Sequence, residues 1–311
     1  MDELHEFTLS DLYKKLALSD DEFEQYLMEL KLLHHFRTCV CGNKMIKRVK
    51  PNGAATHRCT TSLCRKEKGF LVGTFFEGSH LSLKEIFQLA YFWSQNLTGQ
   101  EFLQFQMKRN DGTVISSRTI VDWKQFFRDV CVDHLARNSV MLGAPGTIVE
   151  IDETVISRRK YNRGRMVAEE QWFFAGVQRG TNLCFFQPVE RRNADTLLPI
   201  IQQNILPGTT IMSDLWRAYF RLGEMPENYR HFTVNHSTNF VDPETGACTN
   251  TVESYNQKFK ARHKQEYGTA RSMLTDYMHQ FVWKKRYGGR EAFYNLISQI
   301  REQYPVNFEP L

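Results

Sequence analysis

Three acidic residues of this chain lie at positions that suggest a chemical role. Asp152 lies within the strand-like run at 147–156, and Asp214 ends the apolar run at 210–213. Glu253 lies one turn into an expected polar helix. A carboxylate is disfavoured in a half-buried strand unless its charge is compensated. Strand ends at the carboxyl edge of an open sheet are also where α/β proteins place their chemistry.

Three acids from three separate elements can converge on one point and hold two Mg²⁺ or Mn²⁺ ions about 4 Å apart. Such a pair activates a water or a 3′-hydroxyl and stabilises the leaving oxygen of a phosphodiester. The alternative is three unrelated surface acids. Glu150 and Glu153 are ranked below Asp152 because we expect them on the other face of the sheet, and Asp195 is interpreted as a helix start.

The cysteines predict a second metal site. Cys39-x-Cys41 and Cys59-x₄-Cys64 are separated by 17 residues, and a disulfide framework is not expected because the start MDELHEF does not resemble a signal peptide. Two close pairs can form a tetrahedral Cys₄ zinc site, which would be structural because it leaves no open position. His57 could replace one cysteine. The alternative is free, inert cysteines.

The charge distribution favours a polyanionic partner. The chain carries +5 overall, yet residues 1–30 hold nine acids and two lysines. Basic residues cluster at 36–69, with nine Lys or Arg and one acid, and at 256–290, with nine and two. The alternative is a solvated basic face. The candidate phosphate contacts beside the acids are Arg158, Arg159, Lys160, Arg163, Arg165, Lys258, Lys260 and Arg262.

The first half of the chain is mostly helical in pattern. Residues 8–33 have helical spacing with Ser10 and Ser19 as possible N-caps. Residues 82–139 predict three helices, which suit a helix-turn-helix unit or an ordinary helical bundle. Trp123 and Trp283 are interpreted as core anchors rather than platforms for base stacking.

From Gly146 onward the pattern changes to α/β. Three strand-like runs are followed by a helix, a strand, a helix at WRAYFRLGEM, a strand and a long polar helix. This order predicts an RNase H-like core, which is a mixed sheet flanked by helices. No apolar run approaches the roughly 18 residues needed to span a bilayer, so we expect an intracellular protein without membrane contact.

Several runs together resemble one family of enzymes. VEIDET, KYNRGR, TIMSDLWRAY, TVNHSTNFVDPETGACTNTVES and SSRTIVDWKQFFRDVC are similar to the Merlin superfamily of DDE transposases and to related bacterial insertion-sequence transposases. The resemblance runs from about Cys39 to Tyr287, and the 38 residues between Asp214 and Glu253 match the spacing of that family. His236 also matches a family position.

The resemblance implies a function and its site residues. It implies an RNase H-like core with Asp152, Asp214 and Glu253 as metal ligands, preceded by a zinc ribbon. It also implies binding to duplex DNA at terminal inverted repeats, strand cleavage, joining to target DNA, and assembly as a dimer or larger multimer. The chain departs from the family at Cys248, commonly histidine, and at Tyr255–Asn256, where a tryptophan is frequent.

These observations predict five regions: an acidic helical arm at 1–35, a zinc ribbon at 36–80, a helix-turn-helix-like region at 81–140, a catalytic domain at 141–290 and a C-terminal helix or tail at 291–311. The compartment would be nuclear in a eukaryote and cytoplasmic in a bacterium. Two other functions stay open. One is a domesticated DNA-binding protein with little or no activity, and the other is a nuclease that does not transpose.

Overall fold

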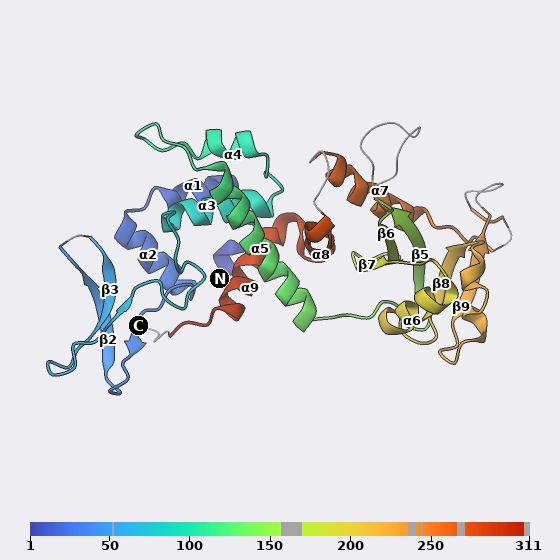
Figure 1. Cartoon of the computed structure of the whole chain (residues 1–311), viewed down its shortest axis with the longest axis horizontal. Coiled ribbons are helices and arrows are strands. Elements are labelled where there is room, and N and C mark those ends of the chain that lie inside the picture. Colours follow the sequence, from blue (N-terminus) through green and yellow to red (C-terminus); the bar gives the residue numbers. More distant parts are fainter. Residues whose placement is uncertain (52, 157–169, 236–240, 244, 266–270, 308–311) are drawn as a thin grey trace. The chain divides into compact units, whose positions relative to one another are not determined.

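The structure is a computed structural model that describes residues 1–51, 53–156, 170–235, 241–243, 245–265 and 271–307. The chain divides into two compact units, which are described separately here (Figure 1). Unit 1 contains Met1–His134 and Tyr287–Leu311, and unit 2 contains Leu135–Arg286. In the described part of the chain, no helix is long and apolar enough to cross a membrane.

The helices of unit 1 pack around aromatic side chains. The rings of Phe7, Phe87 and Phe293 have centroids 5.0–6.2 Å apart, which joins the chain start and two distant helices in one core. The helices of this unit are α1 (Leu9–Leu16), α2 (Asp20–Glu29), α3 (Leu83–Ser94), α4 (Gln100–Gln106), most of α5 (Ser117–Arg137) and α9 (Ala292–Gln303).

The helix starts follow the capping rules, with one correction. Ser19 caps α2, as expected, but α1 is capped by Thr8 and not by Ser10. Thr8 is followed three residues later by Asp11, and each side chain bonds the backbone of the other residue. Ser10 is already the second residue of the helix, so its hydroxyl cannot cap it.

A four-stranded antiparallel sheet forms the rest of unit 1. Its strands are β1 (Arg37–Thr38), β2 (Lys44–Val49), β3 (Ala55–Cys59) and β4 (Glu67–Gly69), in that order across the sheet. The loops between β1 and β2 and between β3 and β4 carry or adjoin the four clustered cysteines. This sheet is compatible with the predicted zinc ribbon.

Unit 2 is built on a mixed sheet with the strand order of an RNase H-like fold. The order is β7-β6-β5-β8-β9; β6 is antiparallel to its neighbours β5 and β7, whereas β8 and β9 run parallel to β5. The strands are β5 (Ile148–Val155), β6 (Trp172–Gln178), β7 (Cys184–Val189), β8 (Thr210–Asp214) and β9 (Arg230–Val234). The predicted fold class is confirmed.

Helices cover both faces of this sheet. Val149, Ile151 and Ile211 point to one face, where they pack with α6 (Ala194–Asn204). Ala175 and Val177 point to the other, where they pack with α7 (Asn250–Gln265) and α8 (Arg271–Tyr287). The alternation of side chains along β5 and β6 therefore decides which acids can meet α7.

One expected helix of this unit is wrong. WRAYFRLGEM forms two short 3₁₀ helices, Arg217–Tyr219 and Leu222–Glu224. The Asp214 carboxylate accepts a hydrogen bond from the Trp216 backbone N–H at 2.9 Å, and Gly223, near the end of the run, is a weak helix former.

Candidate metal and strand-transfer site

Asp152 and Asp214 end up level on neighbouring strands. The parallel pairing of β5 with β8 joins Ile148 to Thr210 and Glu150 to Met212. The same register, carried two residues further, brings Asp152 opposite Asp214 at the carboxyl edge of the sheet. Residues an even number apart in a strand share a face, so both acids project toward the face that α7 covers.

Glu253 approaches this edge from the first turn of α7. Burial raises the pKa of Asp152 to about 7, reinforced by the negative charges of Glu153, Asp214 and Glu253. The structure therefore brings the three predicted acids into one electrostatic cluster. The three acids are spaced more widely than the four clustered cysteines. Among the described residues, only these cysteines have at least three ligand atoms that all lie within 4.8 Å of one another.

Asn256 links α7 directly to this cluster. Its Nδ2 donates a hydrogen bond to Asp152 Oδ2 at 2.8 Å, which opposes the rise in the pKa of Asp152. Asn256 is buried, and its Oδ1 has no hydrogen-bond partner in the structure. Sequence reasoning noted this position only as a departure from a family tryptophan, so its contact with Asp152 was missed.

Glu150 corrects a second expectation. It does not lie on the face opposite Asp152, because residues two apart in a strand share a face. The fully buried Glu150 carboxylate accepts hydrogen bonds from the backbone N–H groups of Thr251 (2.7 Å) and Val252 (2.9 Å) and from the Thr251 hydroxyl (2.9 Å). It therefore caps α7 from another element, where a negative charge also suits the helix dipole.

Arg179 completes this cap from the turn after β6. Its Nε is paired with Glu150, and its Nη2 donates to the Cys248 carbonyl at 2.9 Å and to Cys248 Sγ at 2.7 Å. The thiol of Cys248, a position that departs from the family pattern, thus accepts a hydrogen bond from the charged guanidinium of Arg179. Glu150, Arg179 and Asn256 together fix the residues on both sides of Glu253.

Glu153 lies on the other face of β5, as expected. It accepts a hydrogen bond at 2.6 Å from the hydroxyl of Tyr219, which is fully buried beside Phe174. Burial raises the pKa of Glu153, while the bond from Tyr219 lowers it. Its charge acts on Asp152 through the sheet, so it contributes to the electrostatics without sharing the α7 face.

The four predicted cysteines form one cluster. Cys39 Sγ lies 3.6 Å from Cys64 Sγ, and Cys41 Sγ lies 3.5 Å from Cys59 Sγ. Four sulfur ligands at about 2.3 Å from a tetrahedral zinc ion would lie about 3.8 Å apart. The observed spacing is close to that value, so the cluster can hold zinc. His57 does not join it: its ring stacks on Phe70 and is fully buried.

Comparison with known proteins shows what unit 2 is similar to. Residues 143–286 match the model of the ISXO2-like transposase domain. A Haemophilus influenzae protein named as an uncharacterized transposase-like protein is 31% identical over 77 residues, which cover 23% of this chain and 61% of that protein. Residues 143–286 are therefore similar to the transposase domains of insertion sequences. The expected resemblance to insertion-sequence transposases is confirmed.

Solved structures resemble this chain only distantly. The HTLV-2 integrase catalytic core domain in complex with magnesium is 12% identical, with a TM-score of 0.28 over 45% of this chain and 86% of that one. The mariner Mos1 paired end complex with Mg is 11% identical, with a TM-score of 0.29 over 73% and 79%. Similarity at this level does not establish a shared reaction.

Most of the predicted DNA-contacting residues of unit 2 lie outside the described part. They are Arg158, Arg159, Lys160, Arg163, Arg165 and His236, and the side chain of Arg262 is also outside it. Lys258 is exposed on α7 with its Nζ 5.9 Å from the Tyr255 ring centroid, and Lys260 is half-buried on the same helix. Contact with DNA stays a prediction for all of them.

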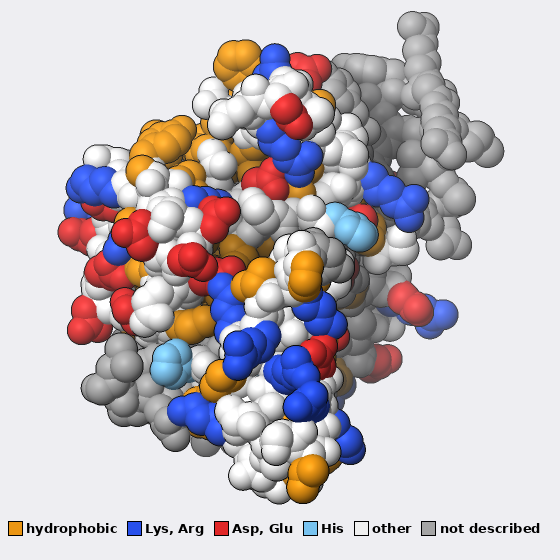
Figure 2. All heavy atoms as spheres, turned by 90° about the vertical axis from the view of Figure 1, so that its left-hand side faces the viewer, with side chains coloured by type: hydrophobic (Ala, Val, Ile, Leu, Met, Phe, Trp, Pro, Cys, Tyr) orange, Lys and Arg blue, Asp and Glu red, His pale blue; other side chains and the backbone are white. Residues whose placement is uncertain are grey.

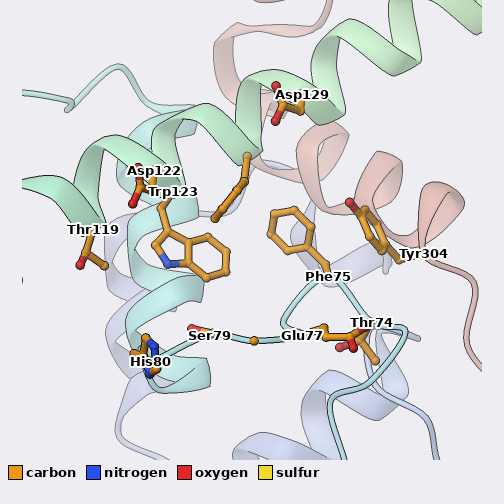
Figure 3. A pocket seen from close by; sticks show the side chains of 12 residues that line it. Thr74, Phe75, Glu77, Ser79, His80, Thr119, Asp122, Trp123, Asp129 and Tyr304 are labelled. Carbon is orange, nitrogen blue, oxygen red and sulfur yellow. The ribbon is translucent and has the colours of Figure 1, made fainter.

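Unit 1 contains an aromatic cavity of about 430 Å³ (Figure 3). Trp123 and Phe75 form its wall with ring centroids 5.6 Å apart, and Tyr304 from the C-terminal part lies 5.4 Å from Phe75. Trp123 is buried, as is Trp283 in unit 2. Both tryptophans are therefore core residues, as predicted.

Proposed function

We propose that this chain cleaves DNA strands at element ends and joins them to target DNA, with Asp152, Asp214 and Glu253 holding two Mg²⁺ or Mn²⁺ ions. The observation that carries this proposal is the level placement of Asp152 and Asp214 on parallel strands, with Glu253 presented to them by α7. The three oxygen ligands are of the kind that both cations prefer.

The electrostatics of the cluster support metal binding. The pKa of Asp152 rises because its carboxylate is buried beside other carboxylates. None of the described side chains that contact Asp152 is a cation. Two divalent ions would neutralise these charges, activate a water or 3′-hydroxyl and stabilise the leaving oxygen. Carboxylates that serve two ions about 4 Å apart need not share one coordination sphere, which suits the spacing of the three acids.

The surrounding residues orient the acids. Asn256 Nδ2 holds one oxygen of Asp152, so the other oxygen is free to face a cation. The Thr249 hydroxyl donates to Glu253 Oε1 at 3.1 Å and sets its rotamer. Glu150 and Arg179 keep the start of α7 against the sheet. The ligands are thus held in place before DNA binds, which is how metal sites are tuned.

The partners follow from the proposed reaction. Duplex DNA with terminal inverted repeats is the donor substrate, a second duplex is the target, and a dimer or larger multimer holds two ends together. The basic residues at 158–165, His236 and the lysines of α7 are proposed to contact phosphates. The four cysteines are proposed to hold one structural zinc ion.

A strand-transfer assay tests this proposal. The substrates are an uncut duplex that contains the inverted repeat flanking the gene and a pre-cut duplex that ends in it, each incubated with plasmid target and either Mg²⁺ or Mn²⁺. We expect joined products from the wild type and none from Asp152→Asn, Asp214→Asn or Glu253→Gln. Asp195→Asn, an exposed acid on α6, serves as the matched control.

The possible outcomes separate three functions. Cleavage without joining would indicate a nuclease. Binding of the repeats without cleavage in either metal would indicate a DNA-binding protein that has lost activity. Wild-type activity in all three variants would exclude these carboxylates from the mechanism.

A further inference from the structure

The basic cluster at 36–69 is not explained by the proposed catalytic chemistry. Its single acid, Glu67, pairs with Lys50 at 2.7 Å and lies 3.8 Å from Arg58. Lys47 pairs with Glu24 and Asp21 of α2. The remaining basic side chains of the sheet outnumber the acids near them. On the face of the molecule that Figure 2 draws, Lys and Arg side chains gather in the lower part of the view. This surplus of positive charge suits an anionic partner.

Three arginines of this cluster line one hollow: Arg48, Arg58 and Arg65. It has a volume of about 560 Å³ and lies beside Cys59 on β2, β3 and the loop after β3. Arg48 and Arg65 are exposed there, and neither has an ion pair within the described residues. The hydroxyl side chains of the loop, Thr60, Thr61 and Ser62, complete the lining.

The loop that carries these groups has a fixed shape. Cys59 N–H donates to the Lys66 carbonyl at 2.9 Å, and the N–H groups of Cys64 and Arg65 both donate to the Thr61 carbonyl at 3.1 Å. The loop begins after one cysteine of the cluster and contains another, so metal binding by the cluster would tighten it further. The guanidinium groups and hydroxyls are therefore presented together and not on a free tail.

We propose that this hollow binds backbone phosphates of duplex DNA. Guanidinium groups match phosphate oxygens with two parallel hydrogen bonds, and hydroxyls are common additional donors to phosphate. Such contacts fix the register of a protein on DNA without reading its sequence. This inference rests on the proposed DNA substrate, but it assigns the contact to residues of unit 1, which contains none of the proposed catalytic acids.

Salt-dependent binding tests the assignment. The full chain, with its cysteine cluster loaded with zinc and without Mg²⁺ or Mn²⁺, is titrated with a fluorescent duplex at several salt concentrations. The slope of log K against log salt is negative, and each lost phosphate contact reduces its magnitude by about 0.9. The double variant Arg48→Gln/Arg65→Gln should therefore lose about 1.8 from the wild-type slope.

A matched control removes the same charge elsewhere. Lys14→Gln/Arg290→Gln deletes two exposed cations that pair with acids, Asp11 and Glu6. We expect its slope to equal that of the wild type. An unchanged slope in Arg48→Gln/Arg65→Gln, or an equal loss in both double variants, would overturn the inference, because the charge would then act without a local site.

Two further outcomes are distinguishable. If the wild type binds no duplex at all, the proposed DNA substrate fails and this inference fails with it. If the arginine double variant binds polyglutamate less well than the wild type but keeps the wild-type affinity and salt slope for the duplex, the hollow is a site for acidic peptides and not for phosphates. If the double variant does not fold, Arg65→Gln alone should lose about 0.9 from the slope.

Discussion

Replacing Glu150 by glutamine should destabilise unit 2 more than any surface substitution. The fully buried Glu150 carboxylate accepts three hydrogen bonds from Thr251 and Val252 and pairs with Arg179. A glutamine has one acceptor oxygen, and its NH₂ group would face donors. Arg179 would lose its counter-ion within the sheet.

The structure gives a magnitude for this loss. Breaking a buried ion pair costs about 3–5 kcal/mol, and each hydrogen bond to a charged group contributes about 1.5–3 kcal/mol. The side chain of Arg179 is 27% exposed and keeps its bond to the Cys248 carbonyl, so water compensates part of its charge. We therefore expect a fall of about 3 kcal/mol in the free energy of unfolding.

Two measurements check this expectation. Urea unfolding followed by tryptophan fluorescence gives the change in stability, and hydrogen exchange reports the amides of Thr251 and Val252, which should lose protection first. Glu190→Gln, an exposed acid that follows β7, should change stability by less than about 0.5 kcal/mol. A loss below about 1 kcal/mol for Glu150→Gln, with both amides still protected, would refute the argument that this carboxylate caps α7.

Three other substitutions test other contacts of the structure. Asp152→Asn should stabilise the protein when Mg²⁺ and Mn²⁺ are absent. A pKa raised from 3.8 to about 7 weakens the folded state by at most about 4 kcal/mol at pH 8 and about 1.6 kcal/mol at pH 5, so the gain in unfolding free energy should shrink as pH falls toward 4. An equal gain at both pH values would contradict this. Tyr219→Phe should cost about 1.5–3 kcal/mol of unfolding free energy, because Glu153 loses a buried donor; an unchanged denaturation midpoint would be the contrary result. Cys64→Ser should lower the zinc content measured by atomic absorption from one ion per chain toward zero, and full retention of zinc would exclude the Cys₄ site.

The sequence was sufficient for the succession of strands in unit 2 and for the selection of Asp152 and Asp214 as strand acids that need an explanation. An acid that closes an apolar strand is informative because burial would otherwise exclude it, and this is why Asp152 and Asp214 could be selected. The close cysteine pairs were predictive for a similar reason, since hairpin ends bring short spacings together. Both patterns are local, so they do not depend on how distant segments pack.

The residues that support the acids could not be found in the same way. Arg179 reaches Cys248 and Glu150 only because β6 returns antiparallel to β5 and ends beside the start of α7. Asn256 meets Asp152 across 104 positions of sequence. Glu150 was recoverable in principle: the period of two in a strand places it with Asp152, and the parity was misassigned.

The spacing of these contacts explains why the first turns of α7 can hold Glu253 against the sheet. Glu150 and Asp152 are two residues apart in β5, or about 6.6 Å at the rise of a strand. Val252 and Asn256, their partners on α7, are four residues apart, or about 6 Å at the rise of a helix. Two attachment points with nearly equal separations keep the helix aligned with the strand, and Glu253 lies between them. The residues at the two departures from the family, Cys248 and Asn256, both take part in this attachment, so they support the placement of the third acid and do not argue against catalysis.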